Sequence, residues 1–162
     1  MFSPELIEVA AAVITAASDK KLKIATAESC TGGLLSALLT EIPHSSNVFE
    51  YGYVTYANAA KEDMLDVSPE MLALHGAVSE PVAAAMAAGA LARSRADVAV
   101  SITGIAGPGG GSAKKPVGLV YMAGMRADGK TIIEKHEFGD LGRSEIRRRA
   151  VAAALAILRR LL

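Results

Sequence analysis

The sequence predicts an α/β fold with three layers, in which helices cover both faces of a mixed, mostly parallel sheet of about five strands. Predicted helices alternate with the first three predicted strands, and such alternation is typical of parallel crossovers. Two later strand-like segments flank Asp128-Gly129, a strong β-hairpin signal, so they add an antiparallel edge. A chain of 162 residues without an internal repeat or linker fits one domain, which we place at residues 1–162.

Residues 1–56 are expected to hold two helices and two strands. Ser3-Pro4-Glu5 begins a helix, because serine caps it, proline fits its first turn and the acid faces the positive end of its dipole. Residues 50–56 alternate and are rich in Tyr and Val, which indicates a strand. The expected elements are a helix over residues 3–17, a strand over 22–27, a helix over 31–40 and the strand over 50–56.

The rest of the chain is expected to hold four helices and three strands. Asn58, Ser68 and Ser79 are residue types that cap helices, and each precedes a helical stretch. The expected elements are helices over residues 58–65, 68–75 and 79–95, a strand over 97–103, a glycine-rich loop over 104–116, hairpin strands over 117–126 and 131–138, and a closing helix from residue 144.

Composition and charge indicate which partners and which cellular compartment to expect. Seventeen basic residues balance seventeen acidic ones, so net charge gives no reason to expect nucleic acid as a partner. The local basic density over residues 143–149 is interpreted as a solvated face of the last helix. Cys30 is the single cysteine, which excludes an internal disulfide and suits a reducing compartment. The N-terminus lacks a basic flank and the apolar runs are too short to span a bilayer, so we expect a cytoplasmic protein with no membrane contact.

Unusual residues follow each of the first three predicted strands. Open α/β sheets bind ligands at the carboxyl ends of their strands, and these ends share one edge when the strands are parallel. We therefore expect the three segments to converge on one ligand site. They are residues 28–33, residues 55–58 with Lys61 one helical turn on, and residues 103–111.

The first segment, Glu28-Ser29-Cys30-Thr31-Gly32-Gly33, places hydroxyls and glycine N–H groups where a strand meets a helix. Such a turn suits a phosphate or the oxyanion of a tetrahedral intermediate. The alternative is a tight turn in which a hydroxyl only caps the helix. The GxxxxGK[ST] pattern is absent, so nucleotide triphosphate hydrolysis loses support. Cys30 is a rival nucleophile to Ser29, although a buried cysteine is a common small core residue.

The other two segments supply candidate bases and a loop. A lysine desolvated in a cleft can lose its proton near neutral pH, so Lys61 is a candidate base; the alternative is an exposed helix lysine. Tyr56 is either a hydrogen-bond donor or a packed aromatic. The glycine-rich loop is a lid, a phosphate cradle that includes Lys114 and Lys115, or a disordered connector. A Ser/His/Asp triad stays an alternative, but Ser29 with Lys61 is preferred because no histidine follows these strands; the histidines are His44, His75 and His136.

Five stretches in order resemble the CinA C-terminal domain family, whose members also occur as stand-alone nicotinamide-nucleotide amidases. The stretches are TAESCTGGLLSALLT, FEYGYVTYANAAK, HGAVSEPVA, SITGIAGPGGGS and KPVGLVY, over residues 26–121, and the closing helix fits as well. The resemblance implies deamidation of nicotinamide mononucleotide to nicotinate mononucleotide and ammonia. It also implies no metal or organic cofactor, a small-molecule nucleotide as the partner, an anticodon-binding-domain-like fold and a homodimer.

The resemblance also assigns site residues. Ser29 matches the nucleophile, and Lys61 and Tyr56 match its catalytic partners. Arg143 follows Gly139-Asp140-Leu141-Gly142, a stretched form of the family's Gly-Asp-Arg, which leaves open whether it reaches the substrate. The alternative function is a non-catalytic pyridine-nucleotide-binding or competence-associated interaction module. The predicted substrate-binding residues are Thr31, Gly32, Gly33, Asn58, Thr103, Gly104, Gly107 and Arg143, with N–H groups near the first three expected to hold the oxyanion.

Overall fold

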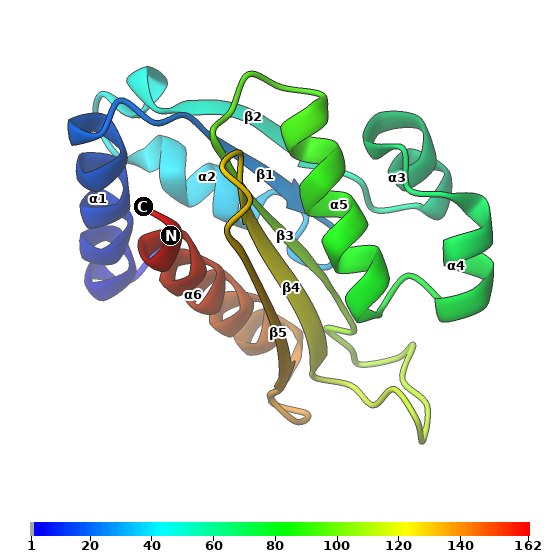
Figure 1. The fold of residues 1–162 in the computed structure, drawn as a ribbon. Helices are drawn as coiled ribbons and strands as arrows, with labels where there is room; N and C mark the ends of the chain where they lie inside the picture. Colours follow the sequence, from blue (N-terminus) through cyan, green and yellow to red (C-terminus); the bar gives the residue numbers. More distant parts are fainter. Residues whose placement is uncertain (1) are drawn as a thin grey trace.

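A five-stranded mixed sheet forms the middle layer of the computed structural model, which describes residues 2–162 (Figure 1). The strand order is β2-β1-β3-β4-β5, and β1 pairs in parallel with β2 and β3, whereas β3–β4 and β4–β5 are antiparallel. The predicted fold class is therefore confirmed. The strands are β1 (Ile24–Glu28), β2 (Phe49–Val54), β3 (Val98–Gly104), β4 (Leu119–Arg126) and β5 (Thr131–Glu137).

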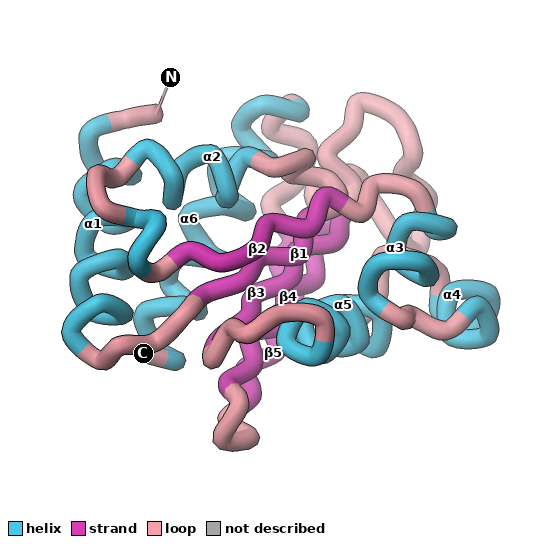
Figure 2. The backbone as a smooth tube through the Cα atoms, turned by 90° about the horizontal axis from the view of Figure 1, so that it is seen from above, coloured by secondary structure: helices cyan, strands magenta, loops and turns pink. Residues whose placement is uncertain are grey.

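Helices cover both faces of this sheet, as Figure 2 shows in the view from above. One face carries α1, α2 and α6, and the other carries α5 with α3 and α4 beside it. The larger hydrophobic core lies on the α1–α2–α6 face. The helices are α1 (Pro4–Asp19), α2 (Leu34–Glu41), α3 (Asn58–Leu65), α4 (Pro69–His75), α5 (Glu80–Ala92) and α6 (Arg143–Leu161), with a short 3₁₀ helix, η1 (Ser45–Asn47).

Small residues bring α3 close to α5. At Gly89 of α5, an added Cβ would lie 2.0 Å from the backbone oxygen of Leu65, the last residue of α3. Such a separation is far below van der Waals contact, so only glycine permits this approach. The approach holds α3 over the carboxyl end of the sheet.

The register of the parallel strands brings the three predicted segments to one edge. Glu28 at the end of β1 lies opposite Val54 of β2 and Ile102 of β3. The alignment continues past the strands, because the Ser29 N–H donates to the Ile102 oxygen at 2.9 Å and the Thr55 N–H donates to the Glu28 oxygen at 2.9 Å. The expected convergence of the strand ends is thus confirmed.

Several helix boundaries differ from the predictions. Helix α2 begins at Leu34, three residues later than expected, because Gly32 and Gly33 adopt positive φ angles of 59° and 90°. Helix α5 ends at Ala92 instead of continuing to residue 95.

Two of the expected serine caps are confirmed by their hydrogen bonds. Ser3 and Ser68 accept from the N–H groups of Leu6 and Met71. Asn58 is instead the first residue inside α3, and Ser79 precedes α5 without a capping side-chain bond. The closing helix begins at Arg143, one residue before the expected start, with no side-chain cap. Among the described helices, none combines the length and the apolar character needed to cross a membrane.

Candidate active site

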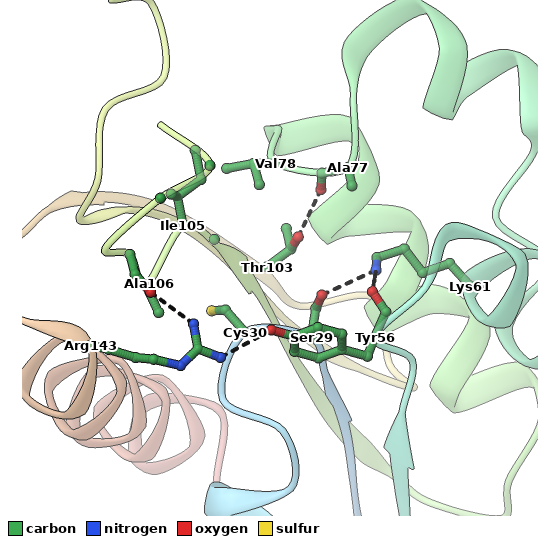
Figure 3. A pocket seen from close by; sticks show the side chains of 14 residues that line it. Ser29, Cys30, Tyr56, Lys61, Ala77, Val78, Thr103, Ile105, Ala106 and Arg143 are labelled. Carbon is green, nitrogen blue, oxygen red and sulfur yellow. Dashed lines mark hydrogen bonds between the residues drawn. The ribbon is translucent and has the colours of Figure 1, made fainter. Parts of the chain in front are cut away.

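A cavity of about 250 Å³ opens at the carboxyl ends of β1, β2 and β3. Five segments line it: the turn after β1, the connection from β2 into α3, the α4–α5 loop, the glycine-rich loop after β3 and the start of α6 (Figure 3). Segments more than 100 residues apart in the sequence therefore share one small site.

Ser29 and Lys61 meet in this cavity. Lys61 Nζ lies 3.1 Å from Ser29 Oγ, and both residues are buried, Lys61 completely. The same Nζ donates to the backbone oxygens of Thr55 at 2.7 Å and Tyr56 at 3.4 Å. Burial lowers the pKa of the Lys61 ammonium below its ordinary value of 10.5. Within residues 2–162, no Asp or Glu lines the cavity that would hold this lysine in its charged form.

The three contacts of Lys61 orient it as a base. A neutral amine has two hydrogens and one lone pair. The two backbone oxygens take the hydrogens, so the lone pair is left to face Ser29 Oγ. The arrangement can therefore remove the hydroxyl proton of Ser29 and return it to a leaving group.

Glu28 holds the turn that carries Ser29. Its buried carboxylate lies on the face of the sheet opposite the Ser29 side chain. It accepts from the N–H groups of Gly33 at 3.1 Å, Leu35 at 3.1 Å and Ser36 at 2.8 Å. The Ser36 hydroxyl adds a fourth bond at 2.7 Å. Glu28 thus caps α2, a role that the sequence reading did not assign to it. The signal available was a lone acid at the end of an apolar strand followed by two glycines.

The same bonds remove two of the expected oxyanion donors. The Gly33 N–H is bound by Glu28, and the Gly32 N–H donates to the Ser29 oxygen at 3.0 Å. Neither glycine lines the cavity, and Thr31 beside them is fully buried with its oxygen accepting from Arg147 at 2.7 Å. The geometry therefore gives no support to these two glycine N–H groups as oxyanion donors. In the part of the chain that the structure describes, the N–H groups of Cys30 and Thr31 have no protein acceptor, and Cys30 lines the cavity.

Arg143 reaches the cavity from the first turn of α6. Its guanidinium donates to the Gly107 oxygen at 2.9 Å and to the Tyr56 hydroxyl at 3.0 Å. The stretched motif before Arg143 therefore does not keep it from the site. Tyr56 is 59% exposed, and its hydroxyl is bonded to Arg143 and not to Ser29 or Lys61. The geometry gives no support to Tyr56 as a proton relay.

The remaining predicted residues divide between the cavity and its surroundings. Thr103, Gly104 and Gly107 line it, and the Thr103 hydroxyl donates to the Ala77 oxygen at 2.7 Å. Asn58 is exposed and does not line it. The sequence reading missed Ala77 and Val78 of the α4–α5 loop as wall residues. Their signal was the stretch HGAVSEPVA, which carried the family resemblance but no candidate site residue.

The geometry of the site does not support a cysteine nucleophile, a Ser/His/Asp triad or a metal ion. Cys30 lines the cavity beside Ser29, but burial raises the pKa of its thiol to about 12, so it is a poor thiolate nucleophile. No histidine among residues 2–162 lines the cavity, which leaves a Ser/His/Asp triad without a base. Lys115 donates to the His75 oxygen at 2.6 Å and stays outside the cavity. No three His, Cys, Asp or Glu side chains of the described residues are grouped to hold a metal ion.

Comparisons with known proteins agree on one family. The model of the CinA C-terminal domain matches residues 6–162. The nicotinamide-nucleotide amidohydrolase PncC of Escherichia coli K12 is 50% identical over 159 residues, which cover 98% of this chain and 95% of that protein. A CinA-like protein of Syntrophobacter fumaroxidans is 56% identical over 140 residues, and this chain spans about a third of its length, at 32%.

The solved structures agree with this result. The crystal structure of the competence/damage inducible protein CihA from Agrobacterium tumefaciens is similar, with a TM-score of 0.98 and 51% identity. The likeness covers 99% of this chain and 98% of that one.

Proposed function

This chain belongs to the CinA C-terminal domain family, and we propose that it is a nicotinamide-nucleotide amidase that converts nicotinamide mononucleotide and water to nicotinate mononucleotide and ammonia. The similarity to a nicotinamide-nucleotide amidohydrolase over almost the full length of both chains supports this activity. The contact that carries the proposal is the 3.1 Å approach of the buried Lys61 amine to Ser29 Oγ. A hydroxyl and an adjacent amine base are what acyl transfer from an amide requires.

The first half of the reaction forms an acyl-enzyme. Ser29 Oγ attacks the carboxamide carbon while its proton passes to Lys61 Nζ. The oxyanion that forms on the carbonyl oxygen accepts from the Cys30 N–H, the donor directly after the nucleophile. Collapse of the tetrahedral intermediate breaks the C–N bond, and the proton held by Lys61 leaves with the nitrogen as ammonia.

The second half releases the acid. A water molecule attacks the ester carbon of the acyl-enzyme, and Lys61 takes its proton. The ester C–O bond then breaks, the proton returns to Ser29 and nicotinate mononucleotide departs. No further catalytic side chain is needed, because Lys61 serves as the base in both halves.

The substrate phosphate is assigned to Arg143. Its guanidinium is the permanent positive charge among the cavity-lining side chains, and Arg pairs well with phosphate. The backbone around Gly107 and the exposed Tyr56 hydroxyl lie beside it and complete a polar rim. The cavity therefore offers an anion site at one end and the Ser29–Lys61 pair at the other.

Ammonia release from nicotinamide mononucleotide tests the proposal. The wild-type chain is expected to release ammonia, and Ser29→Ala and Lys61→Ala are each expected to lose at least a hundredfold in kcat, because each removes a group that takes part in bond making. Unchanged release in either variant contradicts the mechanism. Binding of the nucleotide without ammonia release by the wild type would instead favour the non-catalytic binding module.

Two further expectations stay predictions, one from the family resemblance and one from the composition. A homodimer is expected, and light scattering on the purified chain would measure its mass. A cytoplasmic protein without nucleic-acid partners is also expected, and the zero net charge supports the second part.

A further inference from the structure

Three hydroxyl residues lie in a row across the strand ends. The register of the parallel strands places Thr55 beside Ser29 on one side and Thr103 beside it on the other. Lys61 reaches Ser29 from the β2 side, where it also binds the Thr55 oxygen. Thr103 is therefore the neighbour of the nucleophile on the side away from the base (Figure 3).

The Thr103 hydroxyl has only lone pairs left for a ligand. It carries one hydrogen, which is donated to the Ala77 oxygen at 2.7 Å, and the residue is 1% exposed. Its oxygen can still accept a hydrogen bond in the cavity that it lines.

Three backbone acceptors of the site are already engaged. Lys61 occupies the backbone oxygens of Thr55 and Tyr56, and Arg143 occupies the Gly107 oxygen. The cavity-lining side chains within residues 2–162 include no carboxylate, carboxamide or imidazole. Thr103 Oγ1 is thus the side-chain acceptor that remains next to the nucleophile.

We propose that Thr103 is a specificity residue, which accepts a hydrogen bond from the NH₂ group of the scissile carboxamide. This inference rests on the proposed amidase function and deepens it. The bond holds the leaving nitrogen on the β3 side of Ser29 and directs its developing lone pair towards Lys61. An ester of the same acid has no N–H to donate, and the carboxylate product would set its lone pairs against those of Thr103. The same oxygen therefore favours the amide substrate over the ester and the product.

Hydrolysis of a matched amide and ester tests this role. Nicotinamide mononucleotide and the methyl ester of nicotinate mononucleotide give the same acyl-enzyme. Thr103→Val keeps the side-chain shape and removes the acceptor, so kcat/KM for the amide is expected to fall roughly ten- to hundredfold, while that for the ester falls less than about threefold. Thr103→Ser keeps the hydroxyl and is expected to retain the wild-type ratio of amide to ester.

The outcomes separate this inference from the amidase proposal. If the wild type releases no ammonia, the amidase proposal fails. If the wild type is active but Thr103→Val lowers amide and ester hydrolysis equally, Thr103 only supports the α4–α5 loop through Ala77, and the inference is overturned.

A binding measurement keeps the question open to test if Thr103→Val does not fold. In the Ser29→Ala variant, titration calorimetry is expected to show the amide binding at least about fivefold more tightly than the methyl ester. Equal affinities would overturn the inference.

Discussion

Lys61 shows how one contact changes the chemistry of an ordinary residue. On a solvent-exposed helix Lys61 would be a permanent cation. Gly89 instead allows α3 to pack close to α5, and the Lys61 side chain is completely buried. Two backbone oxygens then accept the hydrogens of the neutral amine, so its lone pair faces Ser29. The sequence could nominate Lys61 from its place after a strand end. It could not predict the burial, because this depends on a helix contact made 28 residues later.

The lowered pKa of Lys61 predicts a pH dependence of stability. The unfolded chain binds this proton with an ordinary pKa of about 10.5, whereas burial lowers the pKa in the folded chain. Below the folded pKa the lysine is charged in both states and the fold bears the full cost of burying the charge. Above 10.5 it is neutral in both states and the cost is absent. The wild type is therefore expected to gain stability relative to Lys61→Met as pH rises between these two pKa values.

Urea unfolding of both proteins across this range measures the effect. Lys61→Met also loses the bonds to Thr55 and Tyr56, but this loss changes the free energy of unfolding by an amount that depends little on pH. The pH slope of the difference in free energy between the two proteins therefore reports the titration of Lys61. A difference that stays flat from about pH 6 to pH 10 would show that the folded pKa is not lowered. The kcat/KM of the wild type is expected to rise with pH over the same transition, since only the neutral amine is a base.

At the scale of the element, the turn between β1 and α2 is the unit that presents the proposed nucleophile. Alternation along β1 sends Glu28 to one face of the sheet and Ser29 to the other, so a single strand end supplies both the cap of α2 and the reacting hydroxyl. Sequence reasoning placed the turn correctly but assigned its glycine N–H groups to the substrate. The difference between this expectation and the observed bonds has a physical cause: whether a buried acid binds a helix N-terminus or a ligand depends on its side-chain direction, which residue spacing does not contain.

Glu28→Gln is expected to weaken this turn. An amide of similar size cannot accept from all the donors that surround the carboxylate, so we expect a loss of about 1–3 kcal/mol in the free energy of unfolding. We also expect kcat to fall at least tenfold with little change in KM, because Ser29 loses its fixed position while Arg143 still holds the substrate.

Ser36→Ala is the matched control for this prediction. It removes one of the four bonds to Glu28 and the 2.8 Å bond between Ser36 Oγ and Thr26 Oγ1, but leaves the charge in place, so a smaller loss of stability is expected. A Glu28→Gln variant with wild-type kcat would show that the turn keeps its geometry without the carboxylate.

At the scale of the whole molecule, the site joins distant parts of the sequence. The alternation of helices and strands, the hairpin and the shared edge of three strand ends were all predictable, because hydrophobic periodicity and parallel register determine them. The cavity wall formed by the α4–α5 loop at Ala77 and the hydrogen bond from Arg143 to Gly107 could not be predicted, because loop paths and the docking of α6 depend on tertiary packing. Pattern reasoning therefore located the site without describing all of its walls.

Arg143 provides a test of how this assembly recognises its substrate. Arg143→Met is expected to raise KM for nicotinamide mononucleotide roughly ten- to hundredfold, since a phosphate loses a charge-assisted hydrogen-bond partner. The corresponding nucleoside, which has no phosphate, is expected to be a poor substrate whose kcat/KM changes less than about threefold. Equal losses for nucleotide and nucleoside would place the phosphate elsewhere.

The position of Arg143 on α6 has a consequence for the newly made chain. Ser29 and Lys61 are synthesised before Arg143, which belongs to a helix that begins about 80 residues after Lys61 and also supplies much of the larger core. A chain that still lacks α6 would hold the proposed nucleophile and base without the proposed phosphate-binding residue. With the phosphate bound by Arg143 as proposed, substrate capture requires the docking of α6, so hydrolysis reports that this site has assembled.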